Sequence, residues 1–242
     1  MTKLIRADLK RCIKKASLYI FLLLTIFVHL MNLIDIKPED SLAYLGSIGD
    51  LVKNVSCVLF PLSVLIAVFG DELHSGAIPI AIGRGLSRGK VLLAKYFDCV
   101  IFMAAQFLIC LGCILLFDSI AGIIASNEDN IRIVLNIILN GFFPACAYLA
   151  IAFFFIFVMW NAAVGFISVM FFAWVAGGVL YLIQSQFKIG VHDAWLQTLF
   201  SHSVTSFSMG DFDIGFIIAV ICYIILPLFL TAIVFRRKEL DL

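Results

Sequence analysis

Long apolar stretches constrain this chain more than any other feature of its sequence. Hydrophobic residues make up 63% of its 242 residues and charged residues only 14%, and the mean hydropathy is +1.12. A soluble domain keeps about a quarter of its residues charged. We therefore expect lipid to be the solvent of this chain.

Six of these stretches are long enough to cross a bilayer, which takes about 20 apolar residues per helix. They are Ala16–Leu33, Leu51–Phe69, Tyr96–Phe117, Ile133–Met159, Ala162–Ile183 and Ile214–Phe235. The fourth and fifth form one apolar run, which only Trp160-Asn161 interrupts. Because helices satisfy their own backbone hydrogen bonds in lipid, the sequence predicts an all-α membrane protein with six transmembrane helices in one domain, 1–242.

The charged residues are distributed unevenly around these stretches. Basic residues gather before the first, between the second and third, and after the sixth. They are Lys3, Arg6, Lys10, Arg11, Lys14, Lys15, Arg84, Arg88, Lys90, Lys95, Arg236, Arg237 and Lys238. Because basic residues favour the cytoplasmic side of a membrane, we expect both termini and the segment 70–95 to face the cytosol. The longest segment expected outside is 184–213.

Residues 1–15 have the pattern of an amphipathic helix. Apolar side chains recur at helical spacing at Leu4, Ile5, Leu9 and Ile13, with basic residues between them. Such a helix lies in the membrane interface with its basic face in water. Its basic face contains Lys3, Arg6, Lys10 and Lys14. It either anchors the topology alone or also contacts a cytosolic partner.

The segment 70–95, called here the inner loop, is the most polar part of the chain between two apolar stretches. It combines an acidic pair, a glycine-containing turn and four basic residues, which indicates a docking surface. The residues concerned are Asp71, Glu72, Ser75, Gly76, Arg84, Ser87, Arg88 and Lys95. Its glycines resemble a phosphate-binding loop, but three or five residues separate them instead of four, and Val91 follows Lys90. We therefore expect no nucleotide site in this chain.

Other chemistry is sparse in the sequence. The four histidines form no pair with metal-ligand spacing, and no nucleophile elbow is present. We expect no catalytic residue, no bound metal and no nucleic-acid partner. Asp98 follows Lys95 at a distance that allows pairing across one helical turn; a proton-transfer site is the alternative. The many phenylalanines between Phe142 and Phe172 are expected to face lipid, or else to line a path for an apolar substrate.

The order of these features resembles the permease subunits of type-2 ABC exporters. In that family an amphipathic helix precedes six spans, and the loop between the second and third spans has an acidic start and a Ser-Arg pair before a lysine. The corresponding residues here are Asp71-Glu72, Ser75-Gly76-Ala77-Ile78, Ser87-Arg88 and Lys95. Ala77 replaces the usual threonine, and Pro79 interrupts the segment. The basic ending from Phe235 to Leu240 is also similar.

The resemblance implies a division of labour. Two permease chains, identical or related, would form the path, and separate cytosolic ATPases would bind ATP and magnesium. The inner loop would hold a coupling helix that docks on the ATPase, in a bacterial cytoplasmic membrane. Small permeases of this kind resemble exporters for bacteriocin or lantibiotic immunity and for phenol-soluble-modulin-type peptides. The cargo is then expected to be hydrophobic or amphipathic.

Two other functions fit the same pattern of spans. The chain is then either the six-span substrate-capture subunit of an importer or a membrane enzyme. A capture subunit would bind a small molecule tightly by itself, whereas an exporter permease would purify together with an ATPase.

Overall fold

The structure, a computed structural model, describes most of the chain. It describes residues 8–34, 47–48, 51–73, 75, 77–121, 131, 134–135, 137–188, 190 and 214–237. Regular structure in these ranges is all helical, which confirms the predicted all-α class. The α-helices are α2 (Ala16–Ile34), α4 (Cys57–Phe69), α5 (Ala77–Gly83), α6 (Arg88–Ala121), α8 (Phe143–Met159), α9 (Ala162–Met170), α10 (Ala176–Phe187) and α13 (Ile214–Arg237). Three π-helical segments directly precede α4, α8 and α10, namely Val52–Ser56, Ile137–Phe142 and Phe171–Val175.

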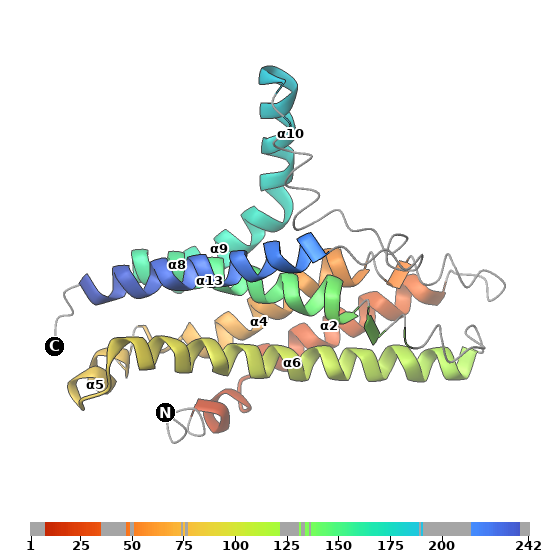
Figure 1. The fold of residues 1–242 in the computed structure, drawn as a ribbon. Coiled ribbons are helices and arrows are strands. Elements are labelled where there is room, and N and C mark those ends of the chain that lie inside the picture. Colours follow the sequence, from red (N-terminus) through yellow and green to blue (C-terminus); the bar gives the residue numbers. More distant parts are fainter. Residues whose placement is uncertain are drawn as a thin grey trace.

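Helices α2, α4, α6, α8 and α13 lie side by side in a bundle (Figure 1). Helices α4, α8 and α13 run in the direction opposite to α2 and α6, so all three end where α6 begins. The short helix α5 lies at this end, and the first described residues lie close to it. We call it the α5 end of the bundle. The charged segments that the sequence assigns to one side of the membrane therefore meet at one end of the molecule.

One unbroken helix among the described residues is long and apolar enough to cross a membrane, namely Arg88–Ile120 within α6. A second, bent candidate combines Ala162–Val175 with Gly178–Phe187. Three shorter apolar helices are Ala16–Met31, Asn54–Phe69 and Phe143–Met159. These helices support membrane association, whereas the number of spans stays a prediction.

The predicted break between the fourth and fifth apolar stretches is confirmed at Trp160-Asn161. Trp160 ends α8 in the left-handed conformation, with φ 53°. Asn161 is extended, and its side chain accepts a hydrogen bond of 2.9 Å from the backbone N–H of Ala163. Asparagine is a favoured N-cap because its side-chain oxygen satisfies a free N–H of the first turn. This cap starts α9 and reverses the direction of the chain.

A cluster of aromatic rings fills the bundle near the α5 end. Phe69, Phe153, Phe157 and Phe235 are fully buried, and their rings meet mostly edge to face, with centroids 4.8–6.0 Å apart. Edge-to-face contact is favourable beyond the apolar area that it buries. The expectation that the phenylalanines face lipid is therefore wrong for Phe153 and Phe157, which join α8 to α4 and α13.

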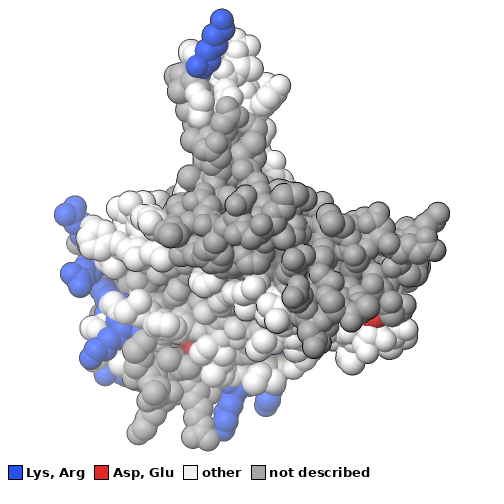
Figure 2. All heavy atoms as spheres, turned by 45° about the vertical axis from the view of Figure 1, so that its right-hand side comes forward, with Lys and Arg blue, Asp and Glu red and all other residues white. Residues whose placement is uncertain are grey.

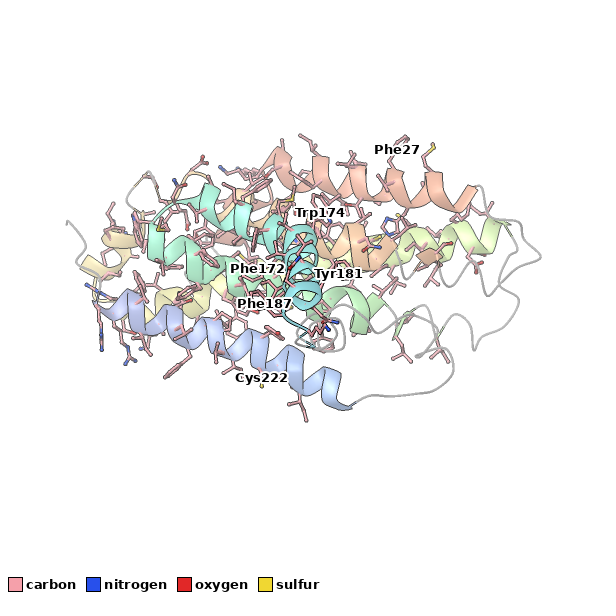
Figure 3. The ribbon with its side chains drawn as sticks, turned by 90° about the horizontal axis from the view of Figure 1, so that it is seen from above. Phe27, Phe172, Trp174, Tyr181, Phe187 and Cys222 are labelled. Carbon is pink, nitrogen blue, oxygen red and sulfur yellow. The ribbon has the colours of Figure 1, made fainter. Side chains whose placement is uncertain are left out.

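The fifth apolar stretch is bent instead of straight. Its two halves make an angle of 51° at the break between Val175 and Gly178. Helix α10 projects from the bundle as an arm in Figure 1, and Figure 3 looks along it from above. Tyr181 and Phe187 on this arm are exposed, as is Trp174 just before the break. The predicted outer segment 184–213 begins within α10, and after Lys188 only Gly190 of this segment belongs to the described residues.

Two polar side chains within the apolar helices join neighbouring helices. The Gln106 amide of α6 donates to the backbone oxygen of Leu18 at 3.2 Å and accepts from the Ser63 hydroxyl at 2.9 Å. His29 of α2 lies 3.3 Å from the Ser56 hydroxyl. Buried polar groups need such partners when no water is available. They stabilise packing, and neither is free to bind a substrate.

Candidate functional site

A buried group of charged residues links three distant segments at the α5 end. The Lys95 ammonium donates to Asp8 Oδ2 at 2.6 Å and to Glu72 Oε1 at 2.5 Å. The Arg11 guanidinium donates to the same oxygen of Glu72. We call Asp8, Arg11, Glu72 and Lys95 the Glu72 cluster. It joins the N-terminal segment, the beginning of the inner loop and the first turns of α6.

Burial makes this cluster unusual. Glu72 is 1% exposed and Lys95 4% exposed, and Asp8 is also buried. Taking charges out of water is costly unless opposite charges and hydrogen bonds replace the solvent. Lys95 has two carboxylate partners, and the Glu72 carboxylate has two cationic partners. The cluster is therefore a fixed internal connection, held by mutual neutralisation.

The electrostatics of Lys95 follow from the same contacts. Burial by itself lowers the pKa of a lysine, because it disfavours the charged form. Here the charges of Glu72 and Asp8 and their hydrogen bonds outweigh burial and raise the pKa of Lys95 above its usual value of 10.5. The ammonium is consequently charged throughout the physiological pH range.

The predicted pairing of Lys95 with Asp98 is wrong. The Lys95 ammonium is bonded to Asp8 and Glu72 instead. Asp98 is fully buried one turn further along α6, and neither of its carboxylate oxygens has a hydrogen-bond partner among the described residues. Residues distant in sequence thus accept the hydrogen bonds of Lys95. The spacing of neighbouring residues does not reveal such long-range partners.

A tight turn after α4 places Glu72 inside and Asp71 outside. The Gly70 N–H donates to Ile66 O at 3.0 Å, and the Ser75 N–H donates to Asp71 O at 3.0 Å. A Cβ atom on Gly70 would lie 2.6 Å from Ile66 O, so the turn needs a glycine here. Asp71 is exposed and pairs with Lys15. Adjacent acidic residues therefore differ: Asp71 forms a surface pair and Glu72 a buried one.

The other end of the inner loop is held by Arg88. Its guanidinium donates to the backbone oxygens of Phe235 at 2.8 Å and Arg236 at 2.9 Å. It also lies 5.9 Å from the centroid of the Phe235 ring. The last carbonyls of a helix lack partners within the helix, and a nearby cation satisfies them. Arg88 thereby connects the start of α6 to the end of α13.

The middle of the inner loop is exposed in contrast. A short helix does lie there, as the sequence predicts: α5 covers Ala77–Gly83 and is held through buried Ile78. Arg84 and Ser87 are exposed, and Gly85 between them has φ +89°. Ser75 is exposed as well, while its hydroxyl donates to Glu72 O at 3.3 Å. Gly76 lies outside the described residues.

The predicted interfacial helix is described only in its second half. Residues 8–12 are helical, and Lys10 and Lys14 are exposed. Lys3 and Arg6 lie outside the described residues. Figure 2 shows that the described lysines and arginines gather at the α5 end, apart from those at the tip of the α10 arm. Lys188, which caps α10, is the residue at this tip.

Sequence reasoning missed the role of Asp8, Arg11 and Lys15. All three bind the inner loop or α6, across 56 to 87 residues of sequence. Asp8 carries the signal that could have found this arrangement, since it is the single acidic residue among the basic residues that precede the first span. An acid in a basic interfacial helix is most easily explained by a buried cationic partner.

Comparisons with known proteins add no family to this description. A search against protein-family models gives no match, and a search of curated proteins gives none either. Within the part of the chain that the structure describes, no three His, Cys, Asp or Glu side chains are grouped to hold a metal ion.

Proposed function

We propose that the chain is the membrane permease subunit of an ATP-driven exporter, and that the middle of its inner loop docks on a cytosolic ATPase. One observation carries the proposal. The exposed segment from α5 to Ser87 is held at both ends by buried or capping contacts, at the basic end of an apolar bundle. A loop that is held in this way can transmit a movement of the partner to several helices at once.

The membrane placement is supported by what the bundle exposes. Large apolar side chains point outward from α2, α6 and α13, among them Leu23, Phe27, Leu108, Leu116 and Phe229. Figure 3 shows Phe27 on the outer side of α2. Soluble monomers rarely expose contiguous apolar patches above a few hundred Å². We infer that lipid covers this surface and that the chain crosses the bilayer six times, with both termini in the cytosol.

The contacts of the inner loop divide the predicted docking residues into two groups. Glu72, Arg88 and Lys95 are engaged within the chain, so their role is to connect the loop to α4, α6 and α13. Arg84, Ser87 and Ser75 are exposed, and we assign them to the contact with the ATPase. Nucleotide binding can shift a permease only through contacts that differ between its states. Because the loop ends are rigidly attached, a change in the contacts with the ATPase is transmitted to the helices.

The other components of the proposed transporter are separate protein chains. The ATPase subunits supply ATP and magnesium, and a second permease chain, identical or related, completes the path in the bacterial cytoplasmic membrane. The cargo we propose is a hydrophobic or amphipathic molecule, with a toxin, bacteriocin or lantibiotic peptide as the first class to test. This chain itself is not an enzyme in this proposal.

The proposal is tested by charge reversal at an exposed position of the loop. Arg84→Glu, in membranes that contain the ATPase encoded beside this chain, is expected to lower cargo-dependent ATP hydrolysis at least tenfold while the chain still inserts and folds. Arg237→Glu is the matched control, since Arg237 is exposed at the same end of the bundle but outside the loop.

Three results would contradict the proposal. The first is normal transport by Arg84→Glu. The second is labelling of position 84 only from the outer side of intact cells, which would reverse the topology. The third is tight binding of a small vitamin-like ligand by the isolated chain, which favours the importer subunit.

A further inference from the structure

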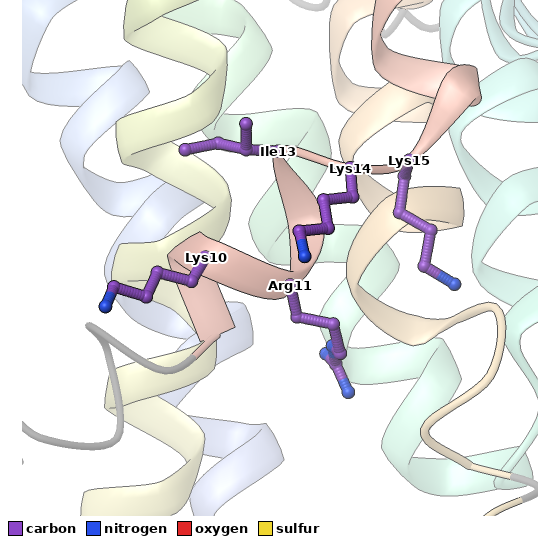
Figure 4. A pocket seen from close by; sticks show the side chains of 5 residues that line it. All are labelled: Lys10, Arg11, Ile13, Lys14 and Lys15. Carbon is purple, nitrogen blue, oxygen red and sulfur yellow. The ribbon is translucent and has the colours of Figure 1, made fainter.

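Two hollows of different chemistry meet on one side of the N-terminal segment. A basic hollow of about 700 Å³ is lined by Lys10, Arg11, Ile13, Lys14 and Lys15 (Figure 4). An apolar groove of about 390 Å³ lies between the N-terminal segment, α2 and α6. Ile13 lines both hollows and is half exposed. A ligand that fills both must carry charge at one end and hydrocarbon at the other.

The basic hollow has positive charge in excess of what the chain neutralises. Arg11 is paired with Glu72 and Asp8, and Lys15 is paired with Asp71. Lys10 and Lys14 are exposed, and neither has an acidic partner among the described residues. In Figure 4, Lys10 and Ile13 extend to the same side, towards α6, whereas Lys15 extends to the opposite side. Two ammonium groups that line the basic hollow, without an acidic partner among the described residues, favour an anionic group in it.

The apolar groove presents hydrocarbon because its polar atoms are already bonded within the chain. Its walls include Leu9, Ile13, Leu22, Ile101, Ala105 and Ile109. The Gln106 amide is hydrogen-bonded to Leu18 O and to the Ser63 hydroxyl, and the Tyr19 hydroxyl donates to Ile13 O at 2.7 Å. The groove therefore offers mainly hydrocarbon contact, which suits an acyl chain.

We propose that this composite site holds one anionic phospholipid of the inner leaflet. Its phosphate lies between Lys10 and Lys14, and one acyl chain lies in the groove between α2 and α6. The charge of the lysines matches the headgroup, and the apolar lining matches the tail. This inference rests on the membrane placement of the proposed function and does not depend on docking to an ATPase.

The position of the site gives the lipid a consequence for the fold. The N-terminal segment that carries Lys10 and Lys14 also carries Asp8 and Arg11 of the Glu72 cluster. A lipid held here fastens this segment against α2 and α6. Anionic lipid is then expected to stabilise the connection on which the inner loop depends.

The test measures which lipid stays with the protein. The full chain is reconstituted in nanodiscs of equal amounts of phosphatidylglycerol and phosphatidylcholine, released into mild detergent, and weighed with its retained lipid by native mass spectrometry. A surface lysine near an anionic leaflet contributes about 1 kcal/mol, so two lysines give a roughly thirtyfold preference. We expect phosphatidylglycerol to be retained about thirtyfold over phosphatidylcholine, and soluble glycerol phosphate not to displace it.

Matched variants assign the preference to the site. Lys10→Gln with Lys14→Gln is expected to abolish the preference, and Ala105→Trp, which fills the groove, to lower retention of both lipids. Lys90→Gln with Arg237→Gln removes the same charge from exposed positions outside the hollow and is expected to change nothing. Equal retention of both lipids by the wild type, or an equal loss in the control pair, would overturn the proposal.

Membrane integration is measured independently on the same preparation. Resistance of the chain to carbonate extraction reports whether it crosses the bilayer. A chain that resists extraction but retains no phosphatidylglycerol contradicts the lipid site alone. A chain that carbonate extracts contradicts the membrane placement, and the proposed function with it.

Discussion

Glu72 and Arg84 belong to the same loop but have opposite surroundings. Glu72 is buried and shares one carboxylate oxygen between Lys95 and Arg11, whereas Arg84 is exposed beyond the end of α5. Arg88 resembles Glu72 in this respect, because it is bonded to the end of α13. The comparison shows that charge in the inner loop serves two purposes. At the loop ends it connects helices, and in the middle it is free to meet a partner.

The largest expected effect comes from removing the buried charge. Glu72→Gln leaves Arg11 and Lys95 with Asp8 as their only acidic partner in the cluster. Breaking a buried ion pair costs about 3–5 kcal/mol, because a charge is left uncompensated. We expect the free energy of unfolding, measured by SDS titration in mixed micelles, to fall by about 3 kcal/mol.

The control for Glu72 is the residue beside it. Asp71→Asn breaks the surface pair with Lys15, and exposed pairs contribute only about 0–1 kcal/mol. If Asp71→Asn and Glu72→Gln destabilise the protein equally, the distinction between buried and exposed acids is wrong.

A smaller loss is expected at the other end of the loop. Arg88→Ala removes two hydrogen bonds to the carbonyls of Phe235 and Arg236, and hydrogen bonds from charged donors contribute about 1.5–3 kcal/mol. We expect a loss of about 2 kcal/mol, measured by the same titration. Arg84→Ala is the matched arginine control and should stay within about 0.5 kcal/mol of the wild type. A larger cost at Arg84 than at Arg88 would reverse the assignment of anchor and docking residue.

The smallest effect is a pH dependence at high pH. The folded-state pKa of Lys95 is raised by Glu72 and Asp8, so the stabilisation from its charge is present in full below the usual value of 10.5. It is lost as pH rises through the higher folded-state value. The stability difference between the wild type and Lys95→Gln should therefore be constant from neutral pH to about 10 and shrink above it. Thermal unfolding at a series of pH values measures this, and a decline already at pH 8 would contradict it.

The sequence was informative where the determining contacts are local. The break at Trp160-Asn161 was predictable because an asparagine N-cap bonds its own first turn. The helix in the inner loop was expected only through the resemblance to exporter permeases, which implies a coupling helix there. The Glu72 cluster was not predictable in the same way, since its hydrogen bonds span 23, 61 and 87 residues. Short-range spacing suggested Asp98 as the partner of Lys95, and long-range packing brought Asp8 and Glu72 there instead.

For a similar reason the sequence could not show which of the predicted docking residues are bonded within the chain and which are exposed. Asp71 and Glu72 are neighbours of the same charge, and the rotation of a single turn decides which one is buried. Arg84 and Arg88 are only four residues apart, on either side of the turn at Gly85, and the position of the α13 end decides which one becomes a cap. Both decisions depend on helices that meet only in the folded bundle.

Contact between the middle of the inner loop and an ATPase, as proposed above, is tested most directly with a photo-reactive amino acid at Ser87. The experiment uses cells that express the chain together with the candidate ATPase. The same probe at Tyr181, which is exposed on the α10 arm, is the control. We expect a crosslinked product with the ATPase from position 87 and none from position 181. No product from position 87, or an equal yield from both, would contradict it.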